Sequence, residues 1–168
     1  CEGTRESRLR PGGGRRARTV MRPRFDFLEN VHLADVDHHG LYVDFGTAAY
    51  WKYAMGRWKT GWGGDTSLNG ETYSYATDKA ARLTLPVEQP GQILLRFRAR
   101  RQGSKSFRVY FNNELIGPVK IGSAATFTDC DIVVPSAHVR VGDNRVLLRF
   151  PAMVRHQNLD VAAAFDSL

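Results

Sequence analysis

Apolar and polar residues alternate over short stretches along most of the chain. The clearest stretch is residues 92–100, where every second position is apolar and positions 96, 98 and 100 are arginine. A period of two over nine residues is typical of a strand with one face in a core and the other in solvent. Similar stretches recur at 41–45, 81–85, 107–111, 130–134, 146–150 and 159–166.

Residues that favour turns separate these stretches. Asn112 and Asn113 tolerate positive φ, as does the Gly-Asp-Asn run at 142–144, and a Pro-Gly pair stands at 90–91. A single helix is predicted, over residues 47–55, with Gly56 ending it. Short strands with one-sided apolar faces predict an all-β fold, an antiparallel β-sandwich of two packed sheets over residues 25–168.

Composition supports one globular domain. The chain has 168 residues, of which 42% are hydrophobic and 24% charged, close to the globular average. These values exclude a largely disordered chain, and two cysteines exclude a disulfide framework. No run approaches the ~18 apolar residues of a membrane-spanning helix.

The net charge of +7 is concentrated at the N-terminus. Residues 1–24 hold eight arginines and two glutamates, whereas residues 25–168 hold 16 basic and 15 acidic residues. The first segment is rich in arginine and glycine without apolar periodicity, so we expect a disordered tether or a basic arm for anionic lipid. A nearly neutral body disfavours nucleic acid as a partner.

The two cysteines have different expected roles. Cys1 at the start of a flexible basic segment resembles the lipid-carrying cysteine of a bacterial lipoprotein, which implies a membrane tether and an extracytoplasmic location. The alternative is a trimmed fragment that happens to begin at cysteine. Cys130 lies in a strand pattern and is expected to be a small buried hydrophobe.

From about residue 81 to 150 the chain resembles a galactose-binding-domain-like jelly roll. The stretches that carry this resemblance are residues 91–100, 109–117, 133–135 and 141–150. The resemblance implies the fold of many carbohydrate-binding modules and of accessory domains on secreted enzymes. It covers about half of the chain and specifies no ligand.

A second resemblance covers residues 35–47 and 58–62. These residues are similar to the N-terminal jelly-roll domain that precedes the catalytic domain in some bacterial lipoprotein-type sulfatases. The resemblance implies an adjacent catalytic domain in the same chain. Neither cysteine is followed by the x-Pro-x-Arg pattern of the sulfatase nucleophile, so this part is not expected to cleave sulfate esters.

The strongest local bias is aromatic. All three tryptophans and four of the six tyrosines lie between residues 50 and 75. Rings on a long loop could stack on sugar C–H faces, or they could close the core or meet a neighbouring domain. The candidate carbohydrate-binding or interface residues are Trp51, Arg57, Trp58, Trp62, Asp65, Tyr73 and Tyr75.

Two further clusters carry charge. Asp35 and Asp37 are two apart, beside His38 and His39, and carboxylate oxygens suit Ca²⁺. Jelly rolls of the resembling type carry a structural calcium where the first and last strands meet, which implies Asp166 as a partner; the alternative is a solvated turn. Separately, four arginines could line one outward face and attract an acidic glycan, or form a solvated face: Arg96, Arg98, Arg100 and Arg108.

No catalytic constellation is visible. The sequence lacks a Gly-x-Ser-x-Gly motif, a phosphate loop and a His-Glu-x-x-His motif. The preferred hypothesis is a non-catalytic accessory module of a secreted or lipid-anchored bacterial enzyme, which packs against a catalytic domain and binds polysaccharide. The alternatives are a stand-alone structural or interaction β-sandwich and a small β-sandwich enzyme.

Overall fold

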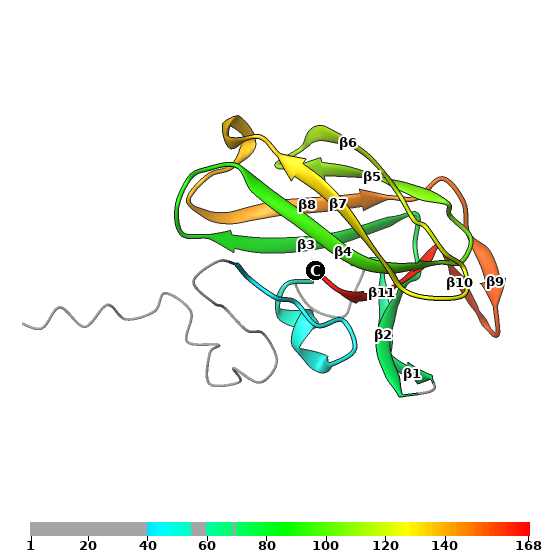
Figure 1. Ribbon diagram of the computed structural model, residues 1–168. Coiled ribbons are helices and arrows are strands. Elements are labelled where there is room, and N and C mark those ends of the chain that lie inside the picture. Colours follow the sequence, from blue (N-terminus) through cyan, green and yellow to red (C-terminus); the bar gives the residue numbers. More distant parts are fainter. Residues whose placement is uncertain (1–39, 55–59, 69) are drawn as a thin grey trace, which may run out of the picture.

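The computed structural model describes residues 40–54, 60–68 and 70–168, together with the backbone but not the side chain of Asp65. Two antiparallel sheets form a sandwich (Figure 1). The five-stranded sheet has the order β1 (Trp62–Leu68), β2 (Glu71–Ala76), β11 (Ala163–Ser167), β4 (Ile93–Arg101) and β7 (Thr128–Val134). The four-stranded sheet has the order β3 (Ala80–Val87), β8 (Gly142–Arg149), β5 (Ser106–Phe111) and β6 (Glu114–Lys120).

The chain passes repeatedly from one sheet to the other. Strands β2, β4, β7 and β11 lie in the five-stranded sheet, while β3, β5, β6 and β8 alternate with them in the four-stranded sheet. Such crossing between layers is the connectivity expected of a jelly roll. The predicted antiparallel β-sandwich is therefore confirmed.

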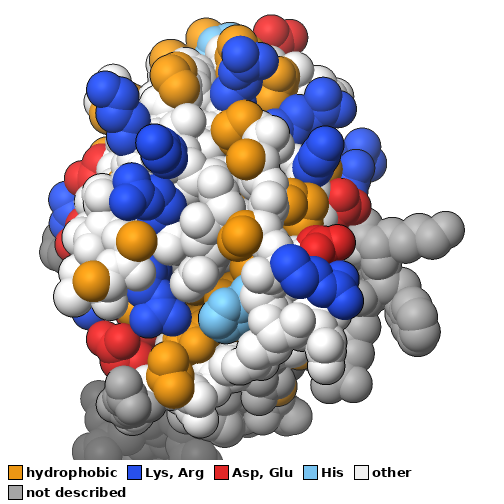
Figure 2. All heavy atoms as spheres, turned by 90° about the vertical axis from the view of Figure 1, so that its right-hand side faces the viewer, with side chains coloured by type: hydrophobic (Ala, Val, Ile, Leu, Met, Phe, Trp, Pro, Cys, Tyr) orange, Lys and Arg blue, Asp and Glu red, His pale blue; other side chains and the backbone are white. Residues whose placement is uncertain are grey.

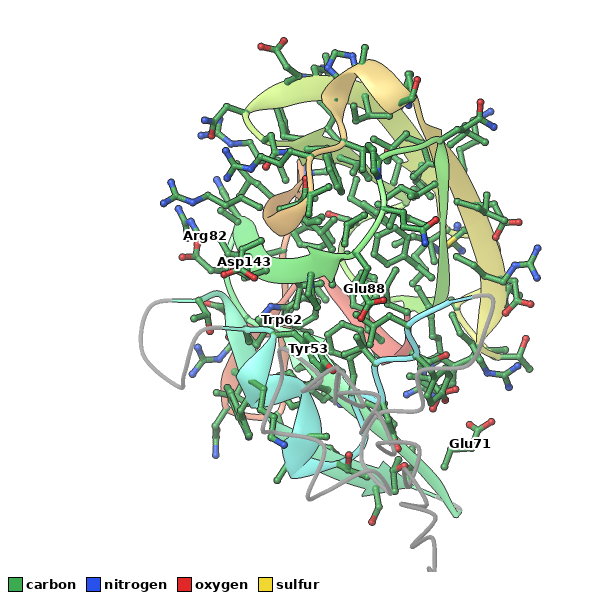
Figure 3. All side chains as sticks on the ribbon, turned by 90° about the vertical axis from the view of Figure 1, so that its left-hand side faces the viewer. Tyr53, Trp62, Glu71, Arg82, Glu88 and Asp143 are labelled. Atoms are coloured by element: carbon green, nitrogen blue, oxygen red, sulfur yellow. The ribbon has the colours of Figure 1, made fainter. Side chains whose placement is uncertain are left out.

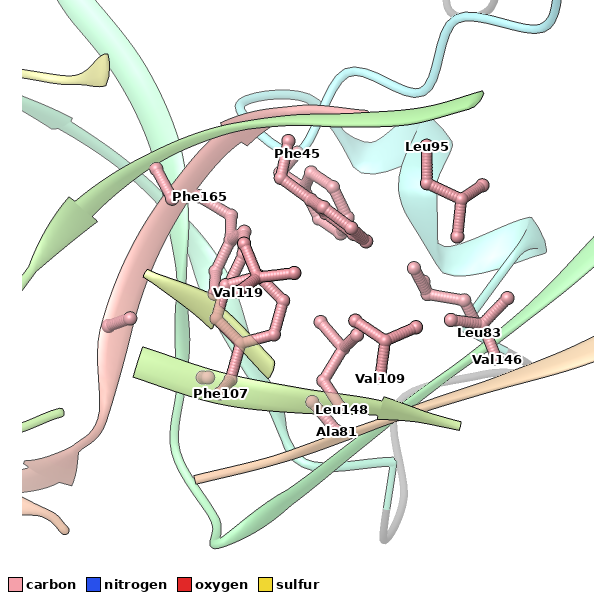
Figure 4. Packing of buried hydrophobic residues seen from close by; sticks show 14 of the residues in the cluster. Phe45, Ala81, Leu83, Leu95, Phe107, Val109, Val119, Val146, Leu148 and Phe165 are labelled. Atoms are coloured by element: carbon pink, nitrogen blue, oxygen red, sulfur yellow. The ribbon is translucent and has the colours of Figure 1, made fainter. Parts of the chain in front are cut away.

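The core lies between the two sheets, where the apolar positions of the predicted strands meet. Phe97 from β4 and Phe165 from β11 pack edge to face against Phe107 from β5, and all three rings are buried. Figure 4 shows Phe107 and Phe165 among the core residues. Edge-to-face pairs add about 0.5–1.5 kcal/mol each to the burial of the rings. Cys130 is also buried, as predicted, and burial raises the pKa of its thiol to about 12.

Strands β1 and β2 form a hairpin where the sequence favoured an aromatic loop. The expectation of a loop through Tyr75 was wrong: residues 71–76 form a strand, and because residues 73–76 are all buried, its burial does not alternate. Its inward Ser74 and Ala76 face the main core, while Tyr73 and Tyr75 are buried on the other side of the same sheet. Strand β1 contains two glycines and has a register shift between Trp62 and Asp65. Its sequence therefore also lacks the regular alternation that predicts a strand.

Three other elements differ from their predictions. The single strand predicted over 159–166 is divided at Ala162 into β10 (Leu159–Val161), which pairs with β9 (Val154–His156), and β11. Residues 41–45 form no full strand but pair with the end of β11 at a bridge between Asp44 and Ser167, where the amides of Val43 and Phe45 donate to the carbonyls of Leu168 and Asp166. The helix predicted over 47–55 is instead a short 3-10 turn, η2 (Ala48–Lys52), and the amides of Tyr53 and Ala54 after it both donate to the carbonyl of the buried Tyr50. A second 3-10 turn, η3 (Ser136–His138), precedes β8.

The outer edge of β3 is covered by the chain just before β1. The backbone carbonyls of Tyr53 and Thr60 accept hydrogen bonds from the amides of Thr84 (2.6 Å) and Arg82 (2.8 Å). Gly61 has a φ of +86°, and a Cβ at this position would lie 2.0 Å from the carbonyl oxygen of Ala80. Only glycine fits this close approach, which protects an edge strand from pairing with other chains.

The side chains of Asn112 and Asn144 join two turns at one end of the four-stranded sheet. Asn112 and Asn113 adopt φ values of 50° and 76°, so the predicted turn is confirmed. Asn144 is fully buried, and its side chain accepts from Asn112 Nδ2 (2.8 Å) and donates to the carbonyls of Arg140 (2.8 Å) and Gly142 (2.9 Å). The sheet end is thus held by a satisfied polar network.

No helix in the described part of the chain has the length and apolar character needed to cross a membrane.

Candidate functional site

Most of the described aromatic residues between 50 and 75, which were candidates for ligand binding, are buried inside the domain. Trp62 is 5% exposed, and its indole N–H donates to the carbonyl of Arg82 at 2.9 Å. Its ring lies 4.6 Å from Phe45 and 5.3 Å from Phe165, centroid to centroid. Figure 3 shows Trp62 and Tyr53 inside the fold beside β3. Of the alternatives for Trp62, these contacts support packing within the domain over stacking on a sugar.

Tyr73 and Tyr75 form a second cluster on the other side of the five-stranded sheet. They are 2% and 6% exposed, and their hydroxyl groups lie 3.2 Å apart. Phe127 and Val161 complete this cluster. Burial, followed by the hydrogen bond from Tyr73, raises the pKa of Tyr75 to about 12. These two rings are buried in a layer that covers the outer side of the five-stranded sheet, and neither has a face open for stacking on a sugar.

The remaining members of the aromatic prediction are only partly placed. Trp51 is half-buried and packs against the Tyr50 ring at 4.3 Å. Asp65 lies on β1, opposite Ser74. Arg57, Trp58 and the side chain of Asp65 lie outside the described residues, so a role for them in binding stays a prediction.

The predicted calcium site is described only at Asp166. This carboxylate is half-buried and pairs with Arg98 at 2.9 Å. Burial raises its pKa against the opposing effect of Arg98, and Asp44 and Glu71 add to the rise. Asp35 and Asp37 lie outside the described residues, and within the described ones no three His, Cys, Asp or Glu side chains gather as metal ligands.

The four arginines of the sequence hypothesis do not share one face. Arg96, Arg98 and Arg100 lie on β4, in the five-stranded sheet, whereas Arg108 lies on β5 in the other sheet. Arg96 binds both oxygens of Asp131, which lowers the pKa of that carboxyl group. The Arg98 guanidinium is held by Asp166, as above.

Arg100 is held by rings instead of a carboxylate. Its guanidinium carbon lies 5.1 Å from the Tyr73 ring centre and 4.9 Å from that of Phe127. The charges on the outer face of β4 are therefore already engaged within the domain.

The outer face of the four-stranded sheet is different. Ser106, Arg108 and Tyr110 point outward from β5, because the residues between them are buried in the core. The register places Arg108 directly opposite Arg149 on β8 and opposite Pro118 on β6. Strands β5, β6 and β8 therefore all contribute side chains to the same patch of surface.

A hollow of about 420 Å³ lies on this patch. It is lined by Ser106, Phe107, Arg108, Tyr110, Pro118, Arg149, Phe150 and Pro151. The Arg149 guanidinium carbon lies 6.0 Å from the Tyr110 ring centre. Neither Arg108 nor Arg149 forms an ion pair with any residue of the described segments.

Figure 2 looks at the end of the sandwich that carries β9 and β10. Lys and Arg side chains are spread over this surface between hydrophobic ones, and acidic side chains are sparse.

Sequence reasoning missed Tyr110, Pro118 and Arg149 as neighbours of Arg108. A usable signal did exist, since the alternation in 107–111 and 146–150 turns Tyr110, Arg108 and Arg149 outward. The order of the strands and their register, which bring the two stretches together, do not follow from that alternation.

No protein-family model and no curated protein sequence matches the chain. Solved structures that it resembles include a family 35 carbohydrate binding module from Clostridium thermocellum, at 15% identity and a TM-score of 0.42, covering 61% of this chain and 82% of the module. Another is a Podospora anserina GH26-CBM35 β-(1,4)-mannanase, at 20% identity and a TM-score of 0.42, covering 64% of this chain and 24% of the mannanase.

A Paenibacillus sp. cycloisomaltooligosaccharide glucanotransferase, complexed with cycloisomaltoheptaose, matches at 12% identity and a TM-score of 0.43, over 75% of this chain and 17% of the enzyme. Likenesses at these identities and scores define neither a family nor a ligand. The class of protein is set by the chain's own topology, an antiparallel β-sandwich.

Proposed function

We propose that the chain is a non-catalytic carbohydrate-binding module whose ligand lies in the hollow on the outer face of the four-stranded sheet. The observation that carries the proposal is the arrangement around Tyr110. This half-buried ring lies in a hollow of about 420 Å³ beside two arginines without ion-pair partners in the described segments. A hollow of this size falls within the range of ligand pockets.

The chemistry of the hollow suits a sugar. Aromatic and proline surfaces (Tyr110, Pro118 and Pro151) offer apolar contact to the C–H face of a pyranose ring. The guanidinium groups of Arg108 and Arg149 carry five N–H donors each, which can bind the hydroxyl groups around the ring edge. Because the hollow rests on three paired strands, the backbone positions of these residues are fixed before a ligand arrives.

The test is binding of the 168-residue chain to a panel of immobilised polysaccharides and a glycan array. Wild type is expected to bind at least one glycan. Tyr110→Ala is expected to weaken that binding about tenfold, which corresponds to 1.4 kcal/mol and is modest for a central tyrosine.

Tyr42→Ala is the matched control, because Tyr42 is 45% exposed and lies beside β11 in the other sheet. Its affinity is expected to stay within twofold of wild type. Absence of binding to every glycan contradicts the proposal and leaves a stand-alone structural or interaction domain. Equal losses in Tyr110→Ala and Tyr42→Ala place the ligand elsewhere.

The wider role is an accessory module of a secreted enzyme. The resemblance of residues 35–47 and 58–62 to a sulfatase accessory domain supports this role, with a catalytic domain in the same chain as the partner. Cys1 would carry the lipid of an extracytoplasmic anchor. Mass spectrometry of the N-terminal peptide from the native host tests the anchor: an acylated Cys1 is expected, and a free thiol contradicts it.

A further inference from the structure

We infer that the hollow takes a sugar that carries an oxyanion, either a sulfate ester or a carboxylate, held between Arg108 and Arg149. The inference rests on the proposed function and adds the charge of the ligand. The register of β5 and β8 carries it, because it makes these two arginines direct cross-strand partners.

Two like charges directly opposite each other on neighbouring strands destabilise a sheet. Their Cβ atoms are about 4.5–5.5 Å apart in such a pair, so the two guanidinium groups can close on a single oxyanion. The row across the sheet is Ala80, Arg149, Arg108 and Pro118, which places a small or compact side chain on each side of the pair. An anion bound there would remove a repulsion that the domain itself leaves in place.

The carboxylates of the described residues do not neutralise this pair. Asp143 is the acidic residue at an outward position of β8, and it lies opposite Pro86, six residues before Arg149. Asp131, Asp160 and Asp166 are engaged with other arginines, Arg96, Arg155 and Arg98. The further cations at outward positions of this sheet are Arg82, Lys120 and Arg145.

A sugar fits this surface better than a nucleic acid. Nucleic-acid-binding domains place cations along an extended stripe or patch, whereas residues 25–168 hold 16 basic and 15 acidic residues. The hollow is compact and combines one partly exposed tyrosine ring with two cations. One anionic group on one sugar residue matches that combination.

The test compares each charged glycan with its neutral counterpart. The probes are chondroitin sulfate and its desulfated form, polygalacturonate and its carboxyl-reduced form, and a DNA duplex. The proteins are the 168-residue wild type and the variants Arg108→Gln, Arg149→Gln and Arg96→Gln. All of them keep residues 1–24, so the contribution of that basic segment to polyanion binding is common to the set.

One charged glycan is expected to bind wild type and Arg96→Gln at least tenfold more tightly than its neutral counterpart. Arg108→Gln and Arg149→Gln are each expected to lose most of this difference, with their binding to the neutral glycan within twofold of wild type. Which charged probe binds distinguishes sulfate from carboxylate. Arg108→Gln also removes the repulsion, so it should melt no lower than wild type, which excludes unfolding as the cause of a loss.

Four results overturn the inference. Equal binding of charged and neutral glycans removes the anion but leaves the carbohydrate-binding function intact. An equal loss in Arg96→Gln shows a general effect of charge, since Arg96 lies on the other sheet. DNA that binds through Arg108 and Arg149 more tightly than any glycan assigns the site to nucleic acid. Absence of binding to every glycan overturns the proposed function together with the inference.

Discussion

Replacing Trp62 by alanine tests whether the aromatic segment is core or ligand platform. A tryptophan buries roughly 150–250 Å², and at about 25 cal/mol per Å² this amounts to about 4–6 kcal/mol. Trp62 is 5% exposed and contacts the rings of Phe45 and Phe165, so most of that area is buried. Its indole N–H also satisfies the carbonyl of Arg82, a hydrogen bond worth about 1 kcal/mol.

We therefore expect Trp62→Ala to lower the free energy of unfolding by about 4 kcal/mol, within the range for large-to-small core substitutions. Urea denaturation followed by far-UV circular dichroism measures the loss. Should Trp62→Ala not fold, Trp62→Phe keeps a ring and lacks the indole donor, and is expected to cost about 1–3 kcal/mol. Leu68→Ala is the control on the same strand, at 50% exposure, with an expected change within ~0.5 kcal/mol.

A loss below about 1 kcal/mol in Trp62→Ala refutes the reasoning. If such a variant kept its stability but lost glycan binding, Trp62 would be a ligand contact, and the assignment of the hollow around Tyr110 would have to be abandoned.

Three further predictions follow from single contacts. Asn144→Ala should cost about 2 kcal/mol in urea denaturation, because it removes four hydrogen bonds of a buried side chain to partly buried partners, while the exposed Asn158→Ala should change little. Gly61→Ala should lower the melting temperature by several degrees, because φ is +86° and the added Cβ would meet the carbonyl oxygen of Ala80. Gly64→Ala, which has open space around its Cβ, should leave the melting temperature unchanged, and equal shifts in the two variants refute the prediction. The pKa of Asp166 is raised in the fold, so its stabilising contribution is present at low pH and lost as pH rises through that pKa. The stability of wild type relative to Asp166→Asn should therefore increase from pH 7 to pH 3, and a constant difference contradicts the raised pKa.

Alternation in the sequence predicts those strands that have one face in the core and the other face in solvent. Strand β4 is the clearest case, with Leu95, Phe97 and Ala99 inward and arginines outward. Strand β2 could not be found in this way because its outward Tyr73 is covered by Phe127 and its partners, so both faces are dry. Trp62, Tyr73 and Tyr75, which suggested a binding loop, lie in two layers of packing on opposite sides of the five-stranded sheet.

The candidate site was harder to predict for a different reason. The sequence pattern marks Arg108 as outward but groups it with the arginines of β4, which are near it in sequence. The two stretches belong to different sheets, and only the pairing of β5 with β8 brings Arg149 beside Arg108. Alternation along a strand gives the face of each residue, whereas its neighbours depend on the order of strands far apart in the sequence.

The two outer faces of the sandwich differ in how their charges are balanced. On the five-stranded sheet, Arg96 and Arg98 each have a carboxylate partner, as an ordinary solvated face would. On the four-stranded sheet, Arg108 and Arg149 oppose each other at a position where a single glutamate on either strand would have formed a stabilising cross-strand pair. Within the described residues, Arg96 and Arg98 are paired with carboxylates whereas Arg108 and Arg149 oppose each other without one, and this contrast within one molecule is the reason for proposing an anionic ligand on the four-stranded sheet.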